Sequence, residues 1–427
     1  MTRTGQLEAL FGRRRFAIKP GIERILALLA QYGNPERRFA TLHVVGTNGK
    51  GSTAAFIAGI LMHAGYRTGL FTSPHLVSYR ERFQLNGMMI GQERLKQLIA
   101  DLLDHAPGEA TFFELTTALA CRWFAESDVE IAVVEAGMGG RHDATAALSG
   151  IATVVTPISL DHCQWLGNSL EAIASEKIAI AVPGSPVIAA EQPDTVHTIL
   201  ERYCRKHGNP LMLAGRDFTV QRNADGTLQY AGLTGVINCP APGLQGHYQT
   251  GNAATALAAM EQLAQLGFPL DHQTMQLGIA AARWPGRFER ISLEAGVDLL
   301  LDGAHNPAGS RALAESLMEQ RIQPVTLLLG MMGDKDLPGI LEPLLSLTQQ
   351  VFTVPLAQER SVSPESLAAL CSDRGRPAQA VRSLSEALTA ARAATAPGGL
   401  IVAAGSLFLV GELMALLAGT ASDAVRG

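Results

Sequence analysis

Apolar, β-branched runs alternate with stretches of helical period along most of the chain. A first series of such runs lies at 39–46, 67–73, 129–137 and 151–160, and a second lies at 297–305, 324–332, 349–356 and 398–406. Apolar residues at helical spacing after the first run predict a helix over 53–64. Strands that alternate with crossover helices are typical of an α/β fold with parallel sheets.

The two series predict two domains. A proline and a glycine interrupt regular structure at Trp284-Pro285-Gly286, so we place a first domain at 1–284 and a second at 285–427. The segment 213–246 has short alternating pieces and little helical period. We interpret it as a small β excursion of the first domain. The alanine-rich stretch 386–396 predicts an ordinary helix.

Composition narrows the class of protein. The 427 residues are 47% hydrophobic and 17% charged, a balance that builds substantial cores. A net charge of -5 argues against a nucleic-acid partner, and no apolar run reaches the roughly 18 residues of a membrane span. The five cysteines form no CxxC pair and the start lacks a signal-type pattern, so we expect a cytoplasmic protein without disulfides.

The turn after the first predicted strand has the composition of a phosphate-binding loop. Glycines let backbone amides approach a phosphate, and the start of a helix adds positive potential. Lys50 is one of only six lysines in the chain. The spacing departs from the standard P-loop, because Val44 stands where its first glycine belongs and Gly51 precedes the hydroxyl residues. An ordinary glycine-rich turn is the alternative. We favour nucleotide binding by Gly46, Thr47, Asn48, Gly49, Lys50, Gly51, Ser52 and Thr53.

Candidate magnesium ligands follow three other strands. Ser73 leaves the second run, Glu135 ends the very apolar third run, and Asp161-His162 ends the fourth. Mg²⁺ prefers oxygen ligands, and strand ends open onto the binding crevice of an α/β sheet. A lone histidine is more often structural, and only convergence with the other strand ends favours His162 as a ligand.

Lys177, in the run Ser175-Glu176-Lys177, has two interpretations. A lysine in this position is ordinarily solvated on a helix. A buried lysine can instead lose its proton and react with carbon dioxide, which gives a carbamate that behaves as a carboxylate. The residues alone favour the solvated lysine.

Taken together, these motifs resemble the folylpolyglutamate synthase and dihydrofolate synthase family of the Mur ligases. The resemblance rests on GTNGKGST, TSPHL, EAGMGG, the Asp-His strand end, the Glu-Lys pair fifteen residues beyond that histidine, and DGAHNP at 302–307. It covers about Lys19 to Glu412. GTNGKG is shared across the Mur ligases, whereas TSPHL and DGAHNP are more specific. The resemblance implies a P-loop-containing Mur-ligase-type domain with a parallel sheet and a smaller Rossmann-like α/β C-terminal domain.

The resemblance also implies a ligand set. ATP phosphates bind the turn 46–53, and two magnesium sites use Ser73, Glu135 and His162, with Glu135 shared. Lys177 matches the family's carbamylated lysine. The nucleotide is also held by Asn252, Arg287 and Asp302. The alternatives are a helix N-cap for Asn252 and a surface cation for Arg287, but the placement of these residues on either side of the predicted domain boundary favours the binding role.

The acceptor side of such a ligase binds a flat bicyclic ring, which favours aromatic or apolar surroundings. Phe112 and Phe113 are a candidate wall for such a ring. Adjacent side chains cannot both point the same way on a regular element, so one of the two is expected in the core. The family's acceptor contacts match Gly21, Ile22, Thr111, Phe112, Phe113, Asp143 and Ala144. The sequence departs from the family after Asp143-Ala144-Thr145, where Ala146 replaces a common asparagine, and at His142, where an apolar residue is frequent.

The implied reaction joins an acid to an amino acid. The acceptor carboxylate attacks the γ-phosphate of ATP while Lys50 and the metals neutralise charge, and the glutamate amine then attacks the acyl phosphate. Lys177 belongs to the catalytic set. His305 and Asp302 are candidates for positioning L-glutamate, and the charged loop 333–336 either assists or is simply solvated. Which group removes the amine proton is left open.

Several alternatives stay open. Another Mur-type ligase acting on a cell-wall precursor is the nearest. A regulatory GTPase needs an Asn-Lys-x-Asp or Thr-Lys-x-Asp motif, and no lysine here follows Asn or Thr. A catalytically silent nucleotide-binding module is a third. If the chain is a folate ligase, its acceptor is dihydropteroate, a reduced folate or both, and we favour a bifunctional enzyme that uses both acceptors. We expect a monomer.

Overall fold

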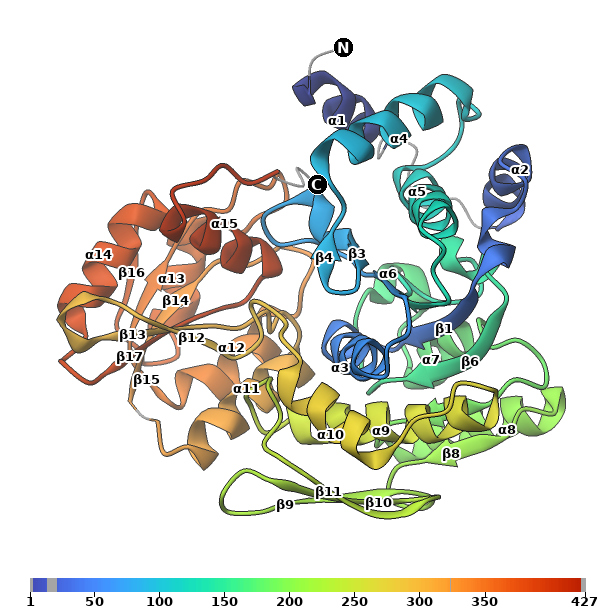
Figure 1. Cartoon of the computed structure of the whole chain (residues 1–427). Coiled ribbons are helices and arrows are strands. Elements are labelled where there is room, and N and C mark those ends of the chain that lie inside the picture. The colour runs from blue at the N-terminus through green and yellow to red at the C-terminus, as the bar shows by residue number, and fades with distance from the viewer. Residues whose placement is uncertain (1–2, 14–20, 323, 424–427) are drawn as a thin grey trace. The chain divides into compact units, whose positions relative to one another are not determined.

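The computed structural model describes residues 3–13, 21–322 and 324–423, which form two compact units (Figure 1). The first unit comprises Met1–Pro74, Arg80–Gly243 and Gln249–Arg283. The second comprises Trp284–Gly427 together with two short segments, His75–Tyr79 and Leu244–Tyr248. No helix among the described residues is both long and apolar enough for a membrane crossing.

The first unit is built on an eight-stranded sheet. Its order is β4-β3-β2-β5-β1-β6-β7-β8, in which β2, β5, β1, β6, β7 and β8 are parallel and the edge strands β3 and β4 are antiparallel. The strands are β1 (Ala40–Val45), β2 (Thr68–Phe71), β3 (Phe83–Leu85), β4 (Met88–Met89), β5 (Ile131–Glu135), β6 (Gly150–Val155), β7 (Val187–Ala189) and β8 (Leu211–Leu213). All five residues of β5 are buried, as expected for a parallel strand covered on both faces.

Helices cover this sheet. α3 packs on β1, β2 and β5 and is itself packed by α9 and α10, while α7 and α8 share an apolar cluster with β1, β6 and β7 (Figure 1). The helices of the unit are α1 (Arg3–Gly12), α2 (Glu23–Gln31), α3 (Lys50–His63), α4 (Gln92–His105), α5 (Phe112–Glu126), α6 (Cys163–Leu166), α7 (Leu170–Ile178), α8 (Asp194–His207), α9 (Gln249–Gln265) and α10 (His272–Ala281). Short 3₁₀ turns form at η2 (Pro35–Arg38), η3 (Tyr79–Arg82) and η4 (Ala144–Ala147).

A three-stranded antiparallel sheet lies within the segment 213–246. It consists of β9 (Thr219–Arg222), β10 (Leu228–Gly232) and β11 (Gly235–Cys239) in the order β11-β10-β9. The buried carboxylate of Glu261 on α9 accepts hydrogen bonds from the Tyr230 hydroxyl at 2.5 Å and from the Thr234 amide at 2.8 Å. One charged group therefore fastens the β10–β11 turn to the helix beside it.

The second unit is a six-stranded sheet with helices on both faces. Its order is β12-β13-β17-β14-β15-β16, parallel except for β12. Leu300 and Leu327 pack towards one cluster, which includes α11, α12 and α13, and their neighbours Leu299 and Leu328 pack towards α14 and α15. The elements are β12 (Glu289–Ser292), η5 (Glu294–Gly296), β13 (Asp298–Leu301), α11 (Pro307–Glu319), β14 (Val325–Leu329), α12 (Leu337–Leu345), β15 (Thr348–Thr353), α13 (Pro364–Ser372), β16 (Ala378–Ala380), α14 (Leu384–Ala394), β17 (Leu400–Ala404) and α15 (Leu407–Leu417).

The predicted α/β fold class is confirmed, and each of the eight predicted apolar runs contains or overlaps one strand. The helix predicted over 53–64 begins earlier, at Lys50. Gly49 is its N-cap residue with φ 86°, a left-handed conformation that glycine adopts readily, so the chain enters the helix within the glycine-rich turn.

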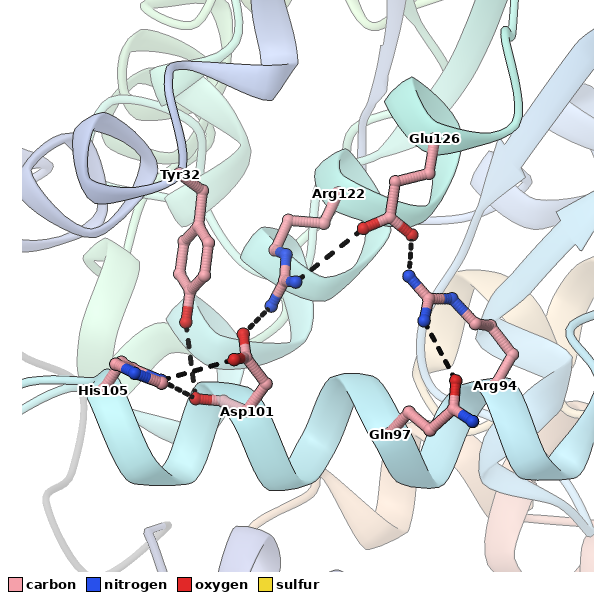
Figure 2. Close-up of polar contacts among 7 residues, drawn as sticks. All are labelled: Tyr32, Arg94, Gln97, Asp101, His105, Arg122 and Glu126. Carbon is pink, nitrogen blue, oxygen red and sulfur yellow. Dashed lines mark hydrogen bonds and ion pairs between the residues drawn. The ribbon is translucent and has the colours of Figure 1, made fainter.

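A polar network joins α4 and α5 to the end of α2 (Figure 2). Arg122 on α5 forms ion pairs with Asp101 on α4 and, at 3.7 Å, with Glu126, and its guanidinium lies 4.1 Å from the centre of the Tyr32 ring. The Arg122 side chain is only 15% exposed, whereas Arg94, which pairs with Glu126 at the outer end of the network, is 42% exposed. Arg122 is therefore the central cation of the network.

Replacing Arg122 with methionine should lower the free energy of unfolding by about 1–2 kcal/mol, because a half-desolvated ion pair and a cation–π contact are lost together. The matched change Arg94→Met, at the exposed end, should cost less than about 0.5 kcal/mol. Urea unfolding of the two variants beside the unmodified chain measures the difference. Equal losses would show that Arg122 is not the centre of the network.

Candidate functional site

The turn between β1 and α3 is shaped by two close approaches of glycine to side chains of neighbouring elements. A Cβ at Gly46 would collide with the Thr156 side chain beyond β6, and one at Gly49 would lie 2.5 Å from Asn252 Oδ1 on α9. Both glycines have positive φ, 148° and 86°. The glycines therefore allow the turn to lie directly between β6 and α9, where larger residues do not fit.

Backbone hydrogen bonds fix the same turn. The amides of Thr47 and Asn48 both donate to the Pro157 carbonyl, at 3.0 and 3.2 Å, and the Thr47 hydroxyl donates to the Ser159 carbonyl at 3.1 Å. These two amides are thus used within the protein. The amides of Lys50, Gly51 and Ser52 lie in the first turn of α3. They have no acceptor within the helix, because no helical carbonyl precedes them by four residues. An anion bound here would be met by that first turn and its dipole.

A cation and a carboxylate stand beside this turn. Lys50 Nζ donates to the Thr47 carbonyl at 3.3 Å and lies 3.8 Å from Glu135 Oε1, while Glu135 Oε2 accepts a hydrogen bond from the Ser73 amide at 3.1 Å. Glu135 ends β5, pairs in register with Val44 of β1 and is 5% exposed. The structure therefore brings together three predicted site residues from three strand ends.

His162 comes from the next strand along. Beyond β6, Ser159 accepts a hydrogen bond from the Asn48 side chain at 3.3 Å, and Asp161 and His162 follow directly. His162 has φ 51°, and its amide donates to Asp161 Oδ1 at 2.8 Å. Among the described residues, no group of three or more His, Cys, Asp and Glu side chains is arranged to hold a metal. A metal here would depend on few protein ligands.

Lys177 is buried, so its alternative interpretation as a solvated lysine is wrong. Its side chain projects from α7, and Nζ donates to the Gly46 carbonyl at 2.7 Å. Burial and, to a lesser extent, the neighbouring charge of Lys50 together lower the pKa of Lys177 to about 7, against the opposite effect of Asp161, Asp143 and Glu176. A large share of this amine is therefore uncharged near neutral pH.

The glycine-rich loop after β5 is the meeting point of several helices. A Cβ at Gly137 would lie 2.5 Å from the Phe113 ring on α5, and one at Gly139 would lie 3.3 Å from Leu166 on α6. A Cβ at Gly140 would collide with the Lys177 carbonyl on α7. The motif EAGMGG is thus explained by packing: α5, α6 and α7 approach one short loop that begins at Glu135.

The segments predicted to contact the acceptor come together in the first unit. α2, which follows Gly21 and Ile22, packs on α5 and on η4, and η4 follows Asp143. Arg24 on α2 forms an ion pair at 2.9 Å with Glu114, whose other oxygen accepts the Thr111 amide at 2.7 Å in the capping box of α5. One ion pair therefore holds the starts of α2 and α5 in register.

The two phenylalanines at the start of α5 separate as expected. Phe112 is buried and packs edge-on against Phe11 of α1. Phe113 is half-buried and lies between Gly137 and Phe71, at the end of β2. Phe112 is therefore a core residue, and Phe113 is the aromatic residue placed next to the loop that carries Glu135.

The Asp143 carboxylate serves the loop itself. It accepts hydrogen bonds from the Met138 amide at 2.8 Å, the Thr145 amide at 2.9 Å and the Thr145 hydroxyl at 2.6 Å. Its burial raises its pKa, against these donors. Ala144 is buried beside it. Asp143 and Ala144 therefore fix the shape of the loop between Met138 and η4.

His43, in the middle of β1, is hydrogen-bonded to the end of the same loop. Its Nε2 bonds the Thr145 carbonyl at 3.0 Å, so the ring is the tautomer that carries its proton there. Nδ1 is buried without a hydrogen-bond partner, and a Cβ at Gly150 would lie 2.5 Å from it. Burial lowers the pKa of His43 to about 4, against the opposite effect of the bond to Thr145. The ring is neutral over the physiological range.

Asn252 is not a helix N-cap, because α9 begins at Gln249 and contains it. Its side chain is 4% exposed and lies against Gly49. The structure therefore places Asn252 against the turn between β1 and α3, as the nucleotide interpretation requires.

In the second unit, the candidate residues gather at the end of β13. Asp302 accepts hydrogen bonds from the Tyr248 hydroxyl at 2.6 Å and from the amides of Phe288 and Ala304, both at 2.9 Å. Burial raises the pKa of Tyr248 well above its usual value, and Asp302 adds to the shift. A Cβ at Gly303 would collide with the Arg287 guanidinium, so Arg287 is half-buried across this loop and is not a simple surface cation.

The remaining polar residues of the DGAHNP motif form hydrogen bonds within their own loop and with the start of α11. His305 Nδ1 bonds the Gly303 carbonyl at 2.8 Å, and Asn306 caps α11 by accepting the Gly309 amide at 2.8 Å, with Pro307 at the first helical position. In the charged loop 333–336, Asp334 is exposed and Asp336 caps α12 through the Gly339 amide. That loop is largely solvated.

Sequence reasoning missed three residues that shape the site, His43, Tyr248 and Gln249. His43 alternates with apolar residues in a strand and gave no local signal. Gln249 and Asn252 are three apart, a spacing that places two side chains on one helix face, so this pair was detectable. Tyr248 bonds a residue 54 positions away, which no local pattern reveals.

The fold and the site define a Mur ligase. The model of the Mur ligase middle domain matches residues 44–260, and that of the Mur ligase glutamate ligase domain matches residues 286–407. Within that class, the chain belongs to the folylpolyglutamate synthase and dihydrofolate synthase family. The predicted resemblance is thereby confirmed.

Three similar proteins illustrate the relationship. The dihydrofolate synthase/folylpolyglutamate synthase of Mycobacterium tuberculosis is 34% identical over 402 residues, which cover 87% of this chain and 82% of that protein. A solved structure of E. coli FolC in complex with DHPP and ADP is 29% identical, covers 98% of both chains and has a TM-score of 0.90. A Haloferax volcanii protein named probable bifunctional folylpolyglutamate synthase/dihydropteroate synthase is 33% identical over 94% of this chain. The chain spans about half the length of that relative.

His43 should make stability depend on pH. Its pKa in the folded chain, about 4, lies below the value of about 6.5 in an unfolded chain, so only the unfolded state takes up a proton between these values. The free energy of unfolding should therefore fall by up to about 3 kcal/mol from this group as the pH drops from 6.5 to 4, and by no more below pH 4.

The variant His43→Gln keeps a donor for the Thr145 carbonyl and cannot titrate. Urea unfolding between pH 7 and pH 4 should show a shallower loss for this variant than for the unmodified chain. Parallel curves for the two proteins would contradict the assignment of a neutral, buried ring.

Proposed function

We propose that this chain is an ATP-dependent ligase that adds L-glutamate to a pteroate or folate carboxylate through an acyl phosphate. The observation that carries the proposal is the phosphate-binding turn, which is fixed by internal bonds yet leaves the first-turn amides of α3 next to Lys50 and Glu135. The family assignment supports it, because the M. tuberculosis relative is named for both activities.

In this proposal the triphosphate of ATP binds at the start of α3. The amides of Lys50, Gly51 and Ser52, the helix dipole and the Lys50 ammonium supply positive potential there. Gly46 to Asn48 and Thr53 complete the turn, and Asn252 bounds it from α9. Arg287 and Asp302 are the second unit's candidates for the nucleotide, with Asp302 acting through the loop that it shapes.

The donor set fits a magnesium ion. Glu135 offers a buried carboxylate at the end of β5, the Ser73 amide donates a hydrogen bond to it, and His162 follows β6, on the other side of β1 in the sheet. Mg²⁺ keeps several waters and takes phosphate oxygens as ligands, which suits a site with few protein side chains. Ser73, Glu135 and His162 would hold two such ions, which would supply charge neutralisation at the transferred phosphoryl group.

The residues around the acceptor have complementary tasks. Phe113 offers an aromatic face for a flat ring beside the loop that begins at Glu135. Gly21, Ile22, Thr111 and Ala144 border the same region, and Asp143 fixes its loop. The acceptor carboxylate attacks the γ-phosphate in line, with Lys50 next to the developing charge. His305, held by the Gly303 carbonyl, is the candidate group for orienting glutamate.

The domain roles are part of the same proposal. Residues 1–284 carry the phosphate-binding turn and the acceptor segments, and 285–427 carry Arg287, Asp302 and His305. We keep the expectations of a monomer and of a cytoplasmic location, the latter because all five cysteines are free thiols.

One assay tests the function. Purified protein with ATP, Mg²⁺ and L-glutamate should release ADP when dihydropteroate or a reduced folate is added, and mass spectrometry should show a product heavier by one glutamyl residue. We expect both acceptors to react. Turnover with a cell-wall nucleotide alone would favour the other Mur-type ligase, and ATP binding without acceptor-stimulated turnover would favour a silent module.

Replacing Glu135 with glutamine should abolish ADP formation, with a loss of at least about 100-fold, because the neutral amide neither pairs with Lys50 nor binds a divalent cation well. Far-UV circular dichroism should be unchanged. The matched change Glu93→Gln, at a side chain that is 78% exposed, should leave turnover as it was. Near-full activity of Glu135→Gln would refute the metal assignment.

Lys177 is proposed to act as a carbamate. Its neutral amine can add carbon dioxide, whereas the guanidinium of Lys177→Arg cannot, so this variant should lose most of its activity. Turnover of the unmodified chain should fall in buffer purged of carbon dioxide and recover with bicarbonate. The control Lys206→Arg, at an exposed position on α8, should behave as the unmodified chain does. Normal turnover of Lys177→Arg would show that the modification has no role.

A further inference from the structure

A buried glutamine links the phosphate-binding turn to the helix that carries Asn252. Gln249 is the first residue of α9 and is 1% exposed. Its Nε2 donates to Ser52 Oγ at 3.2 Å, and its Oε1 accepts from Asn252 Nδ2 at 2.9 Å. Both ends of this side-chain amide are therefore used, one on each of two residues proposed to contact the nucleotide.

The chain of hydrogen bonds has a direction. Asn252 donates to Gln249, and Gln249 donates to Ser52. A hydroxyl has one hydrogen and two acceptor positions, so Ser52 receives a bond and keeps its hydrogen to donate. Ser52 lies in the first turn of α3, beside the amides that lack a helix partner. Its retained hydrogen is available to the same anion as those amides.

The other end of the chain is equally constrained. One hydrogen of the Asn252 amide group is committed to Gln249, and Asn252 Oδ1 stands against Gly49. A side-chain amide in water can exchange the positions of its oxygen and its NH₂ group at little cost. The buried amide of Gln249 cannot, because its oxygen faces a donor and its NH₂ group faces an acceptor. Gln249 thereby sets which face of Asn252 meets the turn.

We propose that Gln249 is a positioning residue for ATP, which fixes the direction of the Asn252–Gln249–Ser52 chain so that Ser52 donates to the phosphates while Asn252 keeps one orientation. The inference rests on the proposed nucleotide site. Gln249 itself touches no reacting atom; it acts through its two neighbours.

Two substitutions remove this function in different ways. Gln249→Met keeps the length of the side chain and removes both bonds. Gln249→Glu keeps an acceptor for Asn252 but cannot donate to Ser52, so the Ser52 hydrogen turns to the carboxylate and a negative charge enters beside the phosphates. The matched control is Gln265→Glu, at the exposed far end of the same helix.

The test is the dissociation constant of Mg-ATP, measured by titration calorimetry with the full chain. Gln249→Met should weaken binding about tenfold and Gln249→Glu more, while Gln265→Glu stays within about twofold. In steady-state assays, KM for ATP should rise and KM for glutamate should not. A midpoint of thermal unfolding for each variant separates these effects from loss of fold, and Gln249→Glu serves if Gln249→Met does not fold.

A double-mutant cycle with Ser52→Ala decides the mechanism. If Gln249 acts through Ser52, adding Gln249→Met to Ser52→Ala should weaken Mg-ATP binding by less than about threefold further. Full additivity, or unchanged ATP binding in both Gln249 variants, would overturn the inference. Failure of the unmodified chain to bind Mg-ATP would instead refute the proposed function, so the two outcomes are distinguishable.

Discussion

The site depends on one constraint: the turn between β1 and α3 has to be rigid without using the amides that a phosphate needs. The chain meets it by committing the Thr47 and Asn48 amides to the Pro157 carbonyl and by leaving the first turn of α3 unpaired within its helix. Neighbouring elements complete the support, because Lys177 bonds the Gly46 carbonyl and Gln249 bonds Ser52. Rigidity thus comes from outside the ligand-binding surface, which is how a preorganised electrostatic site is built.

The strand-end carboxylates divide into two kinds. Asp143 and Asp302 each accept three hydrogen bonds from nearby donors. These bonds stabilise the conformations of the loops that follow β5 and β13. Glu135 instead lies beside Lys50, accepts a hydrogen bond from the Ser73 amide and is the proposed metal ligand. Motif residues of the same chemical type therefore serve different purposes, which only their hydrogen-bond partners distinguish.

The sequence was sufficient for the α/β class and the strand positions, because these depend on local periodicity, while the nucleotide-binding role of the glycine-rich turn stays a prediction. It could not decide whether Lys177 is buried, since a Ser-Glu-Lys run on a helix looks solvated until α7 is packed beneath the turn. It also missed His43, whose importance arises from a bond to Thr145, 102 positions away. The start of α3 was predicted three residues too late, at 53 instead of Lys50. Gly49 leads into the helix through a left-handed conformation, which the spacing of apolar residues does not reveal.

In the proposed reaction, ATP bound at the turn between β1 and α3 phosphorylates the acceptor carboxylate before the amine of glutamate attacks it. An isotope measurement tests it most directly. Acceptor labelled with ¹⁸O in the carboxylate that receives glutamate would be turned over with ATP, Mg²⁺ and glutamate, and the released phosphate analysed by mass spectrometry. An acyl phosphate passes one labelled oxygen to phosphate in each turnover, so we predict one ¹⁸O atom per phosphate. Unlabelled phosphate alongside normal amide formation would contradict the account.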